Sequence, residues 1–236
     1  IKEVKDKIPK KEYNGFSTLV DFPRYEKESS SLVKKYLSGK FGKDPDALDP
    51  KTTSLFYIMD QFQSYRTEPW GRLYDNGGLV IADRYTTSNI IYSGEKALFQ
   101  YGQEMNMDNF ISYLEWLYRT AFDVYGLPIP DVLITFTGEY DTLYSMLHGR
   151  ESTAVKGDIH ESNDSFLIKC GTALSAFHTT LKNYNDYYKK NYPGLDRFFS
   201  KTDHYCINIT DYDNNNQPRS IESIQEEVRS IVDRYI

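Results

Sequence analysis

The sequence predicts an α/β protein in which helices cover both faces of a parallel β-sheet, a three-layer α/β/α arrangement. Short β-rich runs alternate along the chain with segments of helical periodicity, which is the pattern of strand–helix–strand units. The length of 236 residues, with 39% of them hydrophobic, suits one domain that can bury a full core. We therefore expect residues 1–236 to form a single domain.

The expected strands are short apolar runs, as is typical of strands buried in the centre of a sheet. They cover residues 16–20, 79–82, 132–136 and 205–209. Each is separated from the next by enough chain to form a crossover helix, so a parallel order is expected.

Helical patterns fill the intervals between these strands. A helix is expected to begin at Asp49-Pro50, because an aspartate N-cap precedes a proline at the first helical position. Its expected apolar face consists of Leu55, Phe56, Met59 and Phe62. Further helices are expected over residues 31–37, 107–125, 141–147, 165–190 and 220–234. The polar segment 149–161 interrupts the periodicity and is interpreted as a surface loop that acts as a lid.

Composition excludes several classes of partner. The net charge of −6 argues against a broad basic face for nucleic acid or anionic membrane. No apolar run approaches the roughly 20 residues of a membrane helix. Cys170 and Cys206 form neither a metal-binding spacing nor a disulfide framework. We expect a cytoplasmic protein with no nucleic-acid or membrane partner.

Two motifs follow directly after the first two expected strands. They are Phe22-Pro23-Arg24-Tyr25 and Asp83-Arg84-Tyr85-Thr86-Thr87-Ser88-Asn89. Ligands of open parallel sheets bind at the carboxyl ends of strands, and guanidinium groups there can grip a phosphate while a carboxylate holds Mg²⁺. Taken singly, each motif also fits a helix cap with a surface ion pair, or a strand end followed by a turn.

In combination and order, these motifs resemble those of thymidylate kinases, the P-loop nucleoside monophosphate kinases that phosphorylate dTMP. The resemblance also includes Phe56-Tyr57-Ile58-Met59-Asp60, Tyr92, and Lys156-Gly157-Asp158-Ile159-His160-Glu161 in the lid, and it extends from residue 16 nearly to the C-terminus. It implies a P-loop NTPase-type sheet, transfer of the ATP γ-phosphoryl group to dTMP with Mg²⁺, and a homodimer, for which the helix over residues 107–125 is one candidate surface.

The resemblance also implies roles for individual residues. Arg84 and Tyr25 would contact the dTMP phosphate, Tyr57 would stack on thymine, and Phe56 would pack in the core. Asn89 would read the base and Tyr92 would lie against the deoxyribose. The candidate substrate-binding residues are Phe22, Arg24, Tyr25, Tyr57, Arg84, Ser88, Asn89 and Tyr92; the candidate catalytic residues are Asp83, Arg84 and Arg150; Arg150 and Lys156 would act from the lid; and Asp83 is the candidate Mg²⁺ ligand.

The sequence departs from the family pattern in three ways. Gln61 stands where the family has an arginine for the acceptor phosphate, and Thr137 stands where a charged residue is common. No Gly-x-x-x-x-Gly-Lys-Ser/Thr phosphate loop is present. We interpret the chain as an N-terminally truncated kinase without its first, central strand and without activity as written. The alternatives are a non-catalytic nucleotide-binding paralogue and a relative of the deoxynucleoside kinases.

Overall fold

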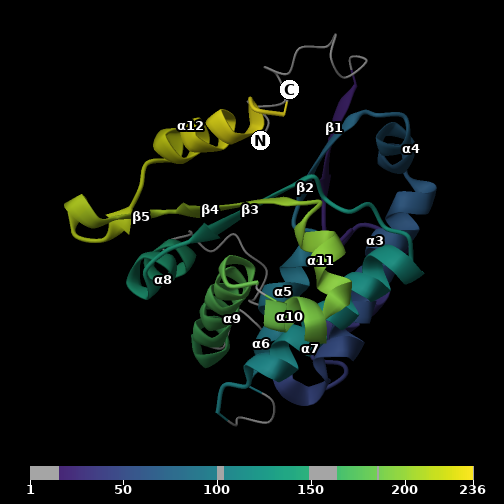
Figure 1. Cartoon of the computed structure of the whole chain (residues 1–236), viewed down its shortest axis with the longest axis horizontal. Coiled ribbons are helices and arrows are strands. Elements are labelled where there is room, and N and C mark those ends of the chain that lie inside the picture. Colours follow the sequence, from purple (N-terminus) through teal and green to yellow (C-terminus); the bar gives the residue numbers. More distant parts are fainter. Residues whose placement is uncertain (1–15, 100–103, 149–163, 185, 236) are drawn as a thin grey trace.

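The computed structural model describes residues 16–99, 104–148, 164–184 and 186–235, and within them the fold is α/β (Figure 1). Helices predominate, and the β-structure consists of small sheets. The predicted lid over residues 149–161, with Arg150 and Lys156, lies outside the described residues.

All four predicted strands are present, and they form two separate parallel pairs. β1 (Ser17–Asp21) pairs with β2 (Leu79–Asp83), and β3 (Val132–Thr137) pairs with β4 (Asp203–Asn208). The two pairs share no ladder within the described residues. A short antiparallel pair, β5 (Thr210–Asp211) with β6 (Gln217–Pro218), follows β4. A continuous sheet with a central strand, in a three-layer α/β/α arrangement, therefore stays a prediction.

The helices surround these strands. Their bounds are α2 (Ser31–Leu37), α3 (Pro50–Thr67), α4 (Pro69–Asp75), α5 (Asn89–Tyr92), α6 (Gly94–Leu98), α7 (Met107–Tyr118), α8 (Tyr140–His148), α9 (Asp164–Lys182), α10 (Asp186–Asn191), α11 (Pro193–Phe199) and α12 (Ile221–Val232). α7 continues as a π-helical turn, Arg119–Val124, and the chain then turns at Gly126 with φ of 63°. Short 3₁₀ turns are Glu28–Ser30, Pro45–Ala47, Thr86–Ser88 and Tyr212–Asn214.

The prediction of one helix over residues 165–190 is wrong, because α9 ends at Lys182 and α10 begins anew at Asp186. Pro193 begins the next helix, α11. Proline is favoured at the first position of a helix, where its missing N–H has no partner to lose.

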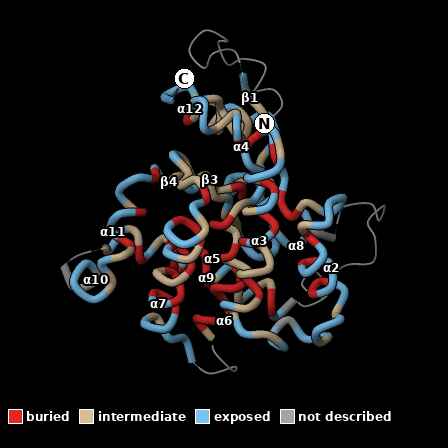
Figure 2. The backbone as a smooth tube through the Cα atoms, turned by 90° about the vertical axis from the view of Figure 1, so that its right-hand side faces the viewer, coloured by how far each residue is buried: buried red, intermediate tan, exposed pale blue. Residues whose placement is uncertain are grey.

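The main hydrophobic core is centred on α7. Phe110, Ile111 and Leu114 of α7 are completely buried and pack with residues of α9 and α11 such as Phe177 and Phe198. Figure 2 shows these buried segments together beneath the strands, with α12 on the opposite side of β3 and β4. The core therefore lies under one side of the strands, while Asp21 and Asp83, the last residues of β1 and β2, are exposed.

α3 positions much of the site, and its buried face is largely polar. Asp49 caps the helix as predicted, accepting hydrogen bonds from the backbone nitrogens of Lys51 at 2.9 Å and Thr52 at 3.0 Å. The predicted apolar face is only partly correct. Met59 is 40% exposed, whereas the buried residues are Thr53, Ser54, Ile58, Asp60, Gln61 and Ser64. Polar side chains can occupy a buried face when they have hydrogen-bond partners, and those partners define the site below.

Candidate functional site at the carboxyl ends of β1 and β2

The two sequence motifs lie side by side, as the strand order predicted. Asp21 and Asp83 are register partners at the last position of β1 and β2. The backbone nitrogen of Phe22 then donates to the carbonyl of Asp83 at 3.0 Å. The residues that follow each strand therefore enter the same edge of the β1–β2 pair.

Arg84 has a strained backbone and an exposed side chain. Its φ of 63° lies in the left-handed region, which non-glycine residues rarely adopt. Such conformations cost on the order of 1–3 kcal/mol and cluster at functional sites. Among the described residues, its guanidinium group has no ion-pair partner. An unpaired cation is thus presented at the carboxyl end of β2.

Asp83 is the neighbouring carboxylate and is also exposed. The described part of the chain contains no cluster of three or more metal-ligating side chains. Mg²⁺, however, is usually held by one or two carboxylates together with water and substrate phosphates. A single exposed aspartate beside an unpaired arginine fits that mode, and the Mg²⁺ role of Asp83 stays a prediction.

Asn89 is buried, as are Thr86 and Thr87 of the second motif. It is 3% exposed, and its backbone carbonyl oxygen accepts a hydrogen bond from the Tyr113 hydroxyl at 3.0 Å. The side-chain nitrogen Nδ2 has no hydrogen-bond partner among the described residues. The same motif is fixed to α3 because Thr86 Oγ1 donates to Gln61 Oε1 at 2.6 Å. Ser88 Oγ accepts a long hydrogen bond of 3.4 Å from the backbone nitrogen of Tyr85.

Gln61 therefore has a structural contact in place of the charge that the family pattern would supply. It is 2% exposed and joins α3 to the turn that carries Ser88 and Asn89. Thr137, the other departure, is the last residue of β3, and its Oγ1 lies 3.5 Å from Sγ of Cys206. Neither residue adds a charge to the site.

The aromatic candidates divide into core residues and accessible ones. Phe22 is 4% exposed and packs against Trp70 and Tyr85, with ring centroids 6.1 Å and 5.9 Å away. Its predicted contact with substrate therefore has no support from the packing. Tyr25 is 43% exposed.

On α3, Phe56 is half-buried and packs against Tyr36 and Phe41. Tyr57 is half-buried beside the cluster formed by Val33, Tyr36 and Leu37. Tyr92, at the end of α5, is also half-buried. The roles of Tyr57 and Tyr92 as aromatic contacts stay predictions.

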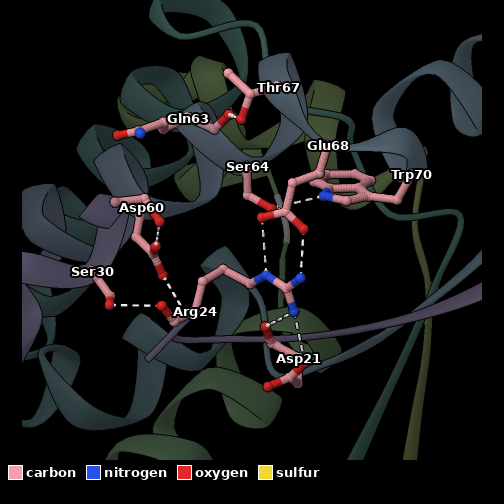
Figure 3. A network of polar contacts seen from close by, with 10 residues as sticks. Asp21, Arg24, Ser30, Asp60, Gln63, Ser64, Thr67, Glu68 and Trp70 are labelled. Carbon is pink, nitrogen blue, oxygen red and sulfur yellow. Dashed lines mark hydrogen bonds and ion pairs between the residues drawn. The ribbon is translucent and has the colours of Figure 1, made fainter. Parts of the chain in front are cut away.

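Arg24 is occupied by carboxylates (Figure 3). Its Nε donates to Glu68 Oε1 at 3.1 Å, Nη2 pairs with Glu68 Oε2, and Nη1 donates to Asp21 Oδ1 at 2.7 Å. The hydrogen bond to Glu68 raises the pKa of Arg24. The predicted contact between this guanidinium group and a phosphate would have to displace Glu68.

The backbone of Arg24 is fixed as well. Its nitrogen donates to Asp60 Oδ2 at 2.8 Å, and its carbonyl oxygen accepts from Ser30 Oγ at 2.7 Å. Ser29 Oγ donates to the other carboxylate oxygen of Asp60 at 2.5 Å. Burial raises the pKa of Asp60, and these hydrogen bonds oppose the rise. The loop after β1 is thereby attached to the middle of α3.

Sequence reasoning did not identify Glu68 as part of this site. Glu68-Pro69 indicates the start of a helix, and α4 does begin at Pro69. Nothing in the sequence indicates that Glu68 pairs with an arginine 44 positions earlier. Only the packing of α4 beside β1 brings these residues together.

Together, these features define an α/β fold with a cationic and carboxylate-bearing site at the ends of parallel strands. A solved structure with a similar fold is thymidylate kinase from Candida albicans, with a TM-score of 0.56 over 99% of this chain and 86% of that chain. Sequence identity is 16%, so the similarity establishes the fold. Neither a protein family nor a curated protein matches the sequence. None of the described helices combines the length and hydropathy needed to cross a membrane.

Proposed function

We propose that the protein is a nucleotide kinase that transfers the γ-phosphoryl group of ATP to dTMP, giving dTDP. The observation that carries this proposal is the pairing of Arg84, an unpaired cation on strained backbone, with the buried and unpartnered amide of Asn89 in the same motif. The guanidinium group of Arg84 is suited to binding an acceptor phosphate, and the amide of Asn89 is suited to hydrogen bonding with the edge of a base. The thymidylate-kinase-like fold supports the same reading.

The proposal also assigns roles to three tyrosines and to Ser88. Tyr25 would contact the phosphate with Arg84, Tyr57 would stack on the base, and Tyr92 would lie against the deoxyribose. Ser88 belongs to the same turn as Asn89. Phosphoryl transfer depends mainly on positioning and on neutralising phosphate charge, so Arg84 would hold the acceptor in line with the donor.

Mg²⁺ would be held at Asp83 and would neutralise charge on the phosphates. ATP requires more than the described residues provide, because the sequence contains no Gly-x-x-x-x-Gly-Lys-Ser/Thr loop. The separation of the β1–β2 and β3–β4 pairs would be bridged by one further parallel strand. We include such a strand, followed by a phosphate loop, in the proposal, together with Arg150 and Lys156 as lid residues.

A second candidate function is that of a nucleotide-binding protein without kinase activity. Gln61 favours it, because this side chain bonds to Thr86 and brings no charge to the acceptor phosphate. Such a protein would bind dTMP without converting it. A third reading, a deoxynucleoside kinase relative, would use thymidine as the acceptor.

The test incubates the protein, including the proposed strand and phosphate loop, with ATP, Mg²⁺ and either dTMP or thymidine, and separates the products by anion-exchange chromatography. We expect dTDP and ADP in equal amounts from dTMP, with at least about a hundredfold loss of turnover in Arg84→Ala, the scale reported for removing one charge-stabilising donor. Arg72→Ala, at an exposed arginine of α4, is the matched control.

The alternatives give different results in this assay. dTMP binding without turnover would support the non-catalytic protein, and dTMP formed from thymidine would support the nucleoside kinase. A protein that neither binds nor converts dTMP would refute the proposed function.

A further inference from the structure

The guanidinium group of Arg24 binds two carboxylates of the same chain, those of Glu68 and Asp21. We call the contact between Arg24 and Glu68 the strap. Arginine recognises carboxylate or phosphate through the same planar fork of N–H groups. Here Nε and Nη2 both face the carboxylate of Glu68, and Nη1 faces Asp21. The side chain is 19% exposed and that of Glu68 is 17% exposed. The edge of the guanidinium group that would bind a phosphate is therefore already occupied by the carboxylate of Glu68.

The charges around Arg24 also disfavour a phosphate there. The carboxylate of Asp60, which is completely buried, accepts from the Arg24 backbone, while Glu68 and Asp21 flank the guanidinium group. A phosphate dianion entering this cluster would meet these carboxylates at short range, where like charges repel strongly. Arg84 offers the same charge at the adjacent strand end and, within the described part of the chain, forms no ion pair with a carboxylate.

The strap joins elements that are far apart in the sequence. Arg24 lies in the loop after β1, whereas Glu68 lies at the junction of α3 and α4. Lys34 of α2 adds a further attachment, since its Nζ donates to the carbonyl oxygen of Tyr25 at 2.9 Å. Tyr25 is therefore held between the strap on one side and α2 on the other, with its ring exposed.

We propose that Glu68 is a positioning residue that, by binding Arg24 through both carboxylate oxygens, fixes the loop that presents Tyr25 to the acceptor nucleotide, and that Arg24 does not itself bind the phosphate. The role of Tyr25 rests on the proposed function, whereas the strap rests on contacts within the chain. In this proposal, Arg84 binds the acceptor phosphate.

Binding experiments separate a strap from a phosphate ligand. Glu68→Gln, Arg24→Gln and the double variant are titrated with dTMP and with thymidine. Each variant should bind dTMP about tenfold more weakly, as expected for loss of one charged hydrogen-bonded pair. Thymidine binding should be unchanged, because the proposed contact of Tyr25 is with the phosphate. The double variant should be no weaker than either single variant, because all three lack the same pair. Tighter dTMP binding by Glu68→Gln, or a loss of dTMP binding in Arg24→Gln that Glu68→Gln does not share, would overturn the proposal.

Hydrogen–deuterium exchange tests the strap without any nucleotide. Amides of residues 22–30 should exchange faster in Glu68→Gln and Arg24→Gln than in the unmodified protein, and at the original rate in Glu26→Gln, a change at an exposed neighbouring carboxylate. Arg24→Lys keeps the charge but loses the planar fork of N–H donors, so the exchange of these amides should be intermediate. This variant replaces Arg24→Gln in the experiment if Arg24→Gln does not fold. Unchanged exchange in these variants would refute the strap, whereas a protein that binds no nucleotide but shows the faster exchange would refute only the proposed function.

Discussion

Asn89 carries a buried amide nitrogen that no described residue satisfies. Buried polar groups are almost always hydrogen-bonded, and leaving one unpaired costs about 1–3 kcal/mol. Proteins retain such groups where a ligand completes the hydrogen bond. The amide of Asn89 lies in the same motif as Arg84, and under the proposed function its partner would be the base of the acceptor nucleotide.

Replacing Asn89 should therefore separate binding from stability. Asn89→Leu keeps a similar volume and removes the unpaired amide, so the free energy of unfolding should be unchanged or up to about 2 kcal/mol higher. Binding of dTMP should weaken at least about tenfold. Urea unfolding and calorimetric titration measure the two effects.

Tyr113→Phe is the control for this prediction. It removes a hydroxyl whose hydrogen bonds to Ser54 and to the Asn89 carbonyl are satisfied, and it should lower the unfolding free energy by about 1 kcal/mol. An Asn89→Leu protein that is less stable but binds dTMP normally would assign Asn89 to the core.

Glu95 is a second buried residue with unsatisfied atoms. It is 1% exposed, and neither of its carboxylate oxygens has a partner among the described residues. Burial raises its pKa from 4.5 to about 7; Asp46 adds to the rise, while Lys169 and Lys96 oppose it. The folded state therefore holds a proton on Glu95 at a pH where the unfolded chain has lost it.

The unfolding free energy should fall as the pH rises from about 4.5 to about 7, because the folded state binds more protons than the unfolded state in this window. At about 1.4 kcal/mol per pKa unit, the contribution of Glu95 is about 3 kcal/mol. Glu95→Gln should flatten the profile over this window, as measured by urea unfolding at several pH values. Glu222→Gln, at an exposed position, should leave the slope unchanged, and an unaltered slope in Glu95→Gln would contradict the prediction.

At the scale of elements, α3 shows what local sequence can and cannot predict. Its start was predictable because Asp49 and Pro50 carry a local signal that the structure confirms. Its buried polar face was not, because the partners of Asp60 and Gln61 come from segments far away in sequence. The position of both motifs directly after predicted strands indicated that they would lie side by side. The pairing of Arg24 with Glu68 was not predictable in this way, because it depends on tertiary packing.

Short helices were missed for a related reason. α5 and α6 span only a turn or little more, too short for a hydrophobic period to be visible. The opposite error extended α9 beyond Lys182, because polar and aromatic residues continue a helix-like pattern there after the helix has ended.

The cap of α3 gives a prediction at this scale. Asp49→Ala should lower the unfolding free energy by about 1 kcal/mol, because Asp49 accepts hydrogen bonds from Lys51 and Thr52 that alanine cannot replace. Asp49→Asn should retain most of the stability, since asparagine is an equally good cap. Thermal and urea unfolding of both variants test this, and equal losses in both would show that the cap is not what stabilises the helix start.

At the scale of the whole molecule, the predicted homodimer is still untested. The apolar face of α7 is buried within this chain by α9 and α11, and the residues that α7 leaves exposed are polar, such as Asp108 and Ser112. If α7 is the interface, its contacts must be made by this polar face. Sedimentation velocity at micromolar concentration should show a dimer, and Ser112→Arg should dissociate it. A monomer in the unmodified protein would remove the dimer from the proposal.

The central claim is that Arg84 and its neighbours form a site for a nucleoside monophosphate. The most direct measurement is a calorimetric titration of dTMP and of thymidine into the unmodified protein and into Arg84→Ala. The proposal predicts that the unmodified protein binds dTMP more tightly than thymidine, and that Arg84→Ala loses this difference while still binding thymidine. Equal affinity for the two ligands, or a preference for dTMP that survives the substitution, would contradict it.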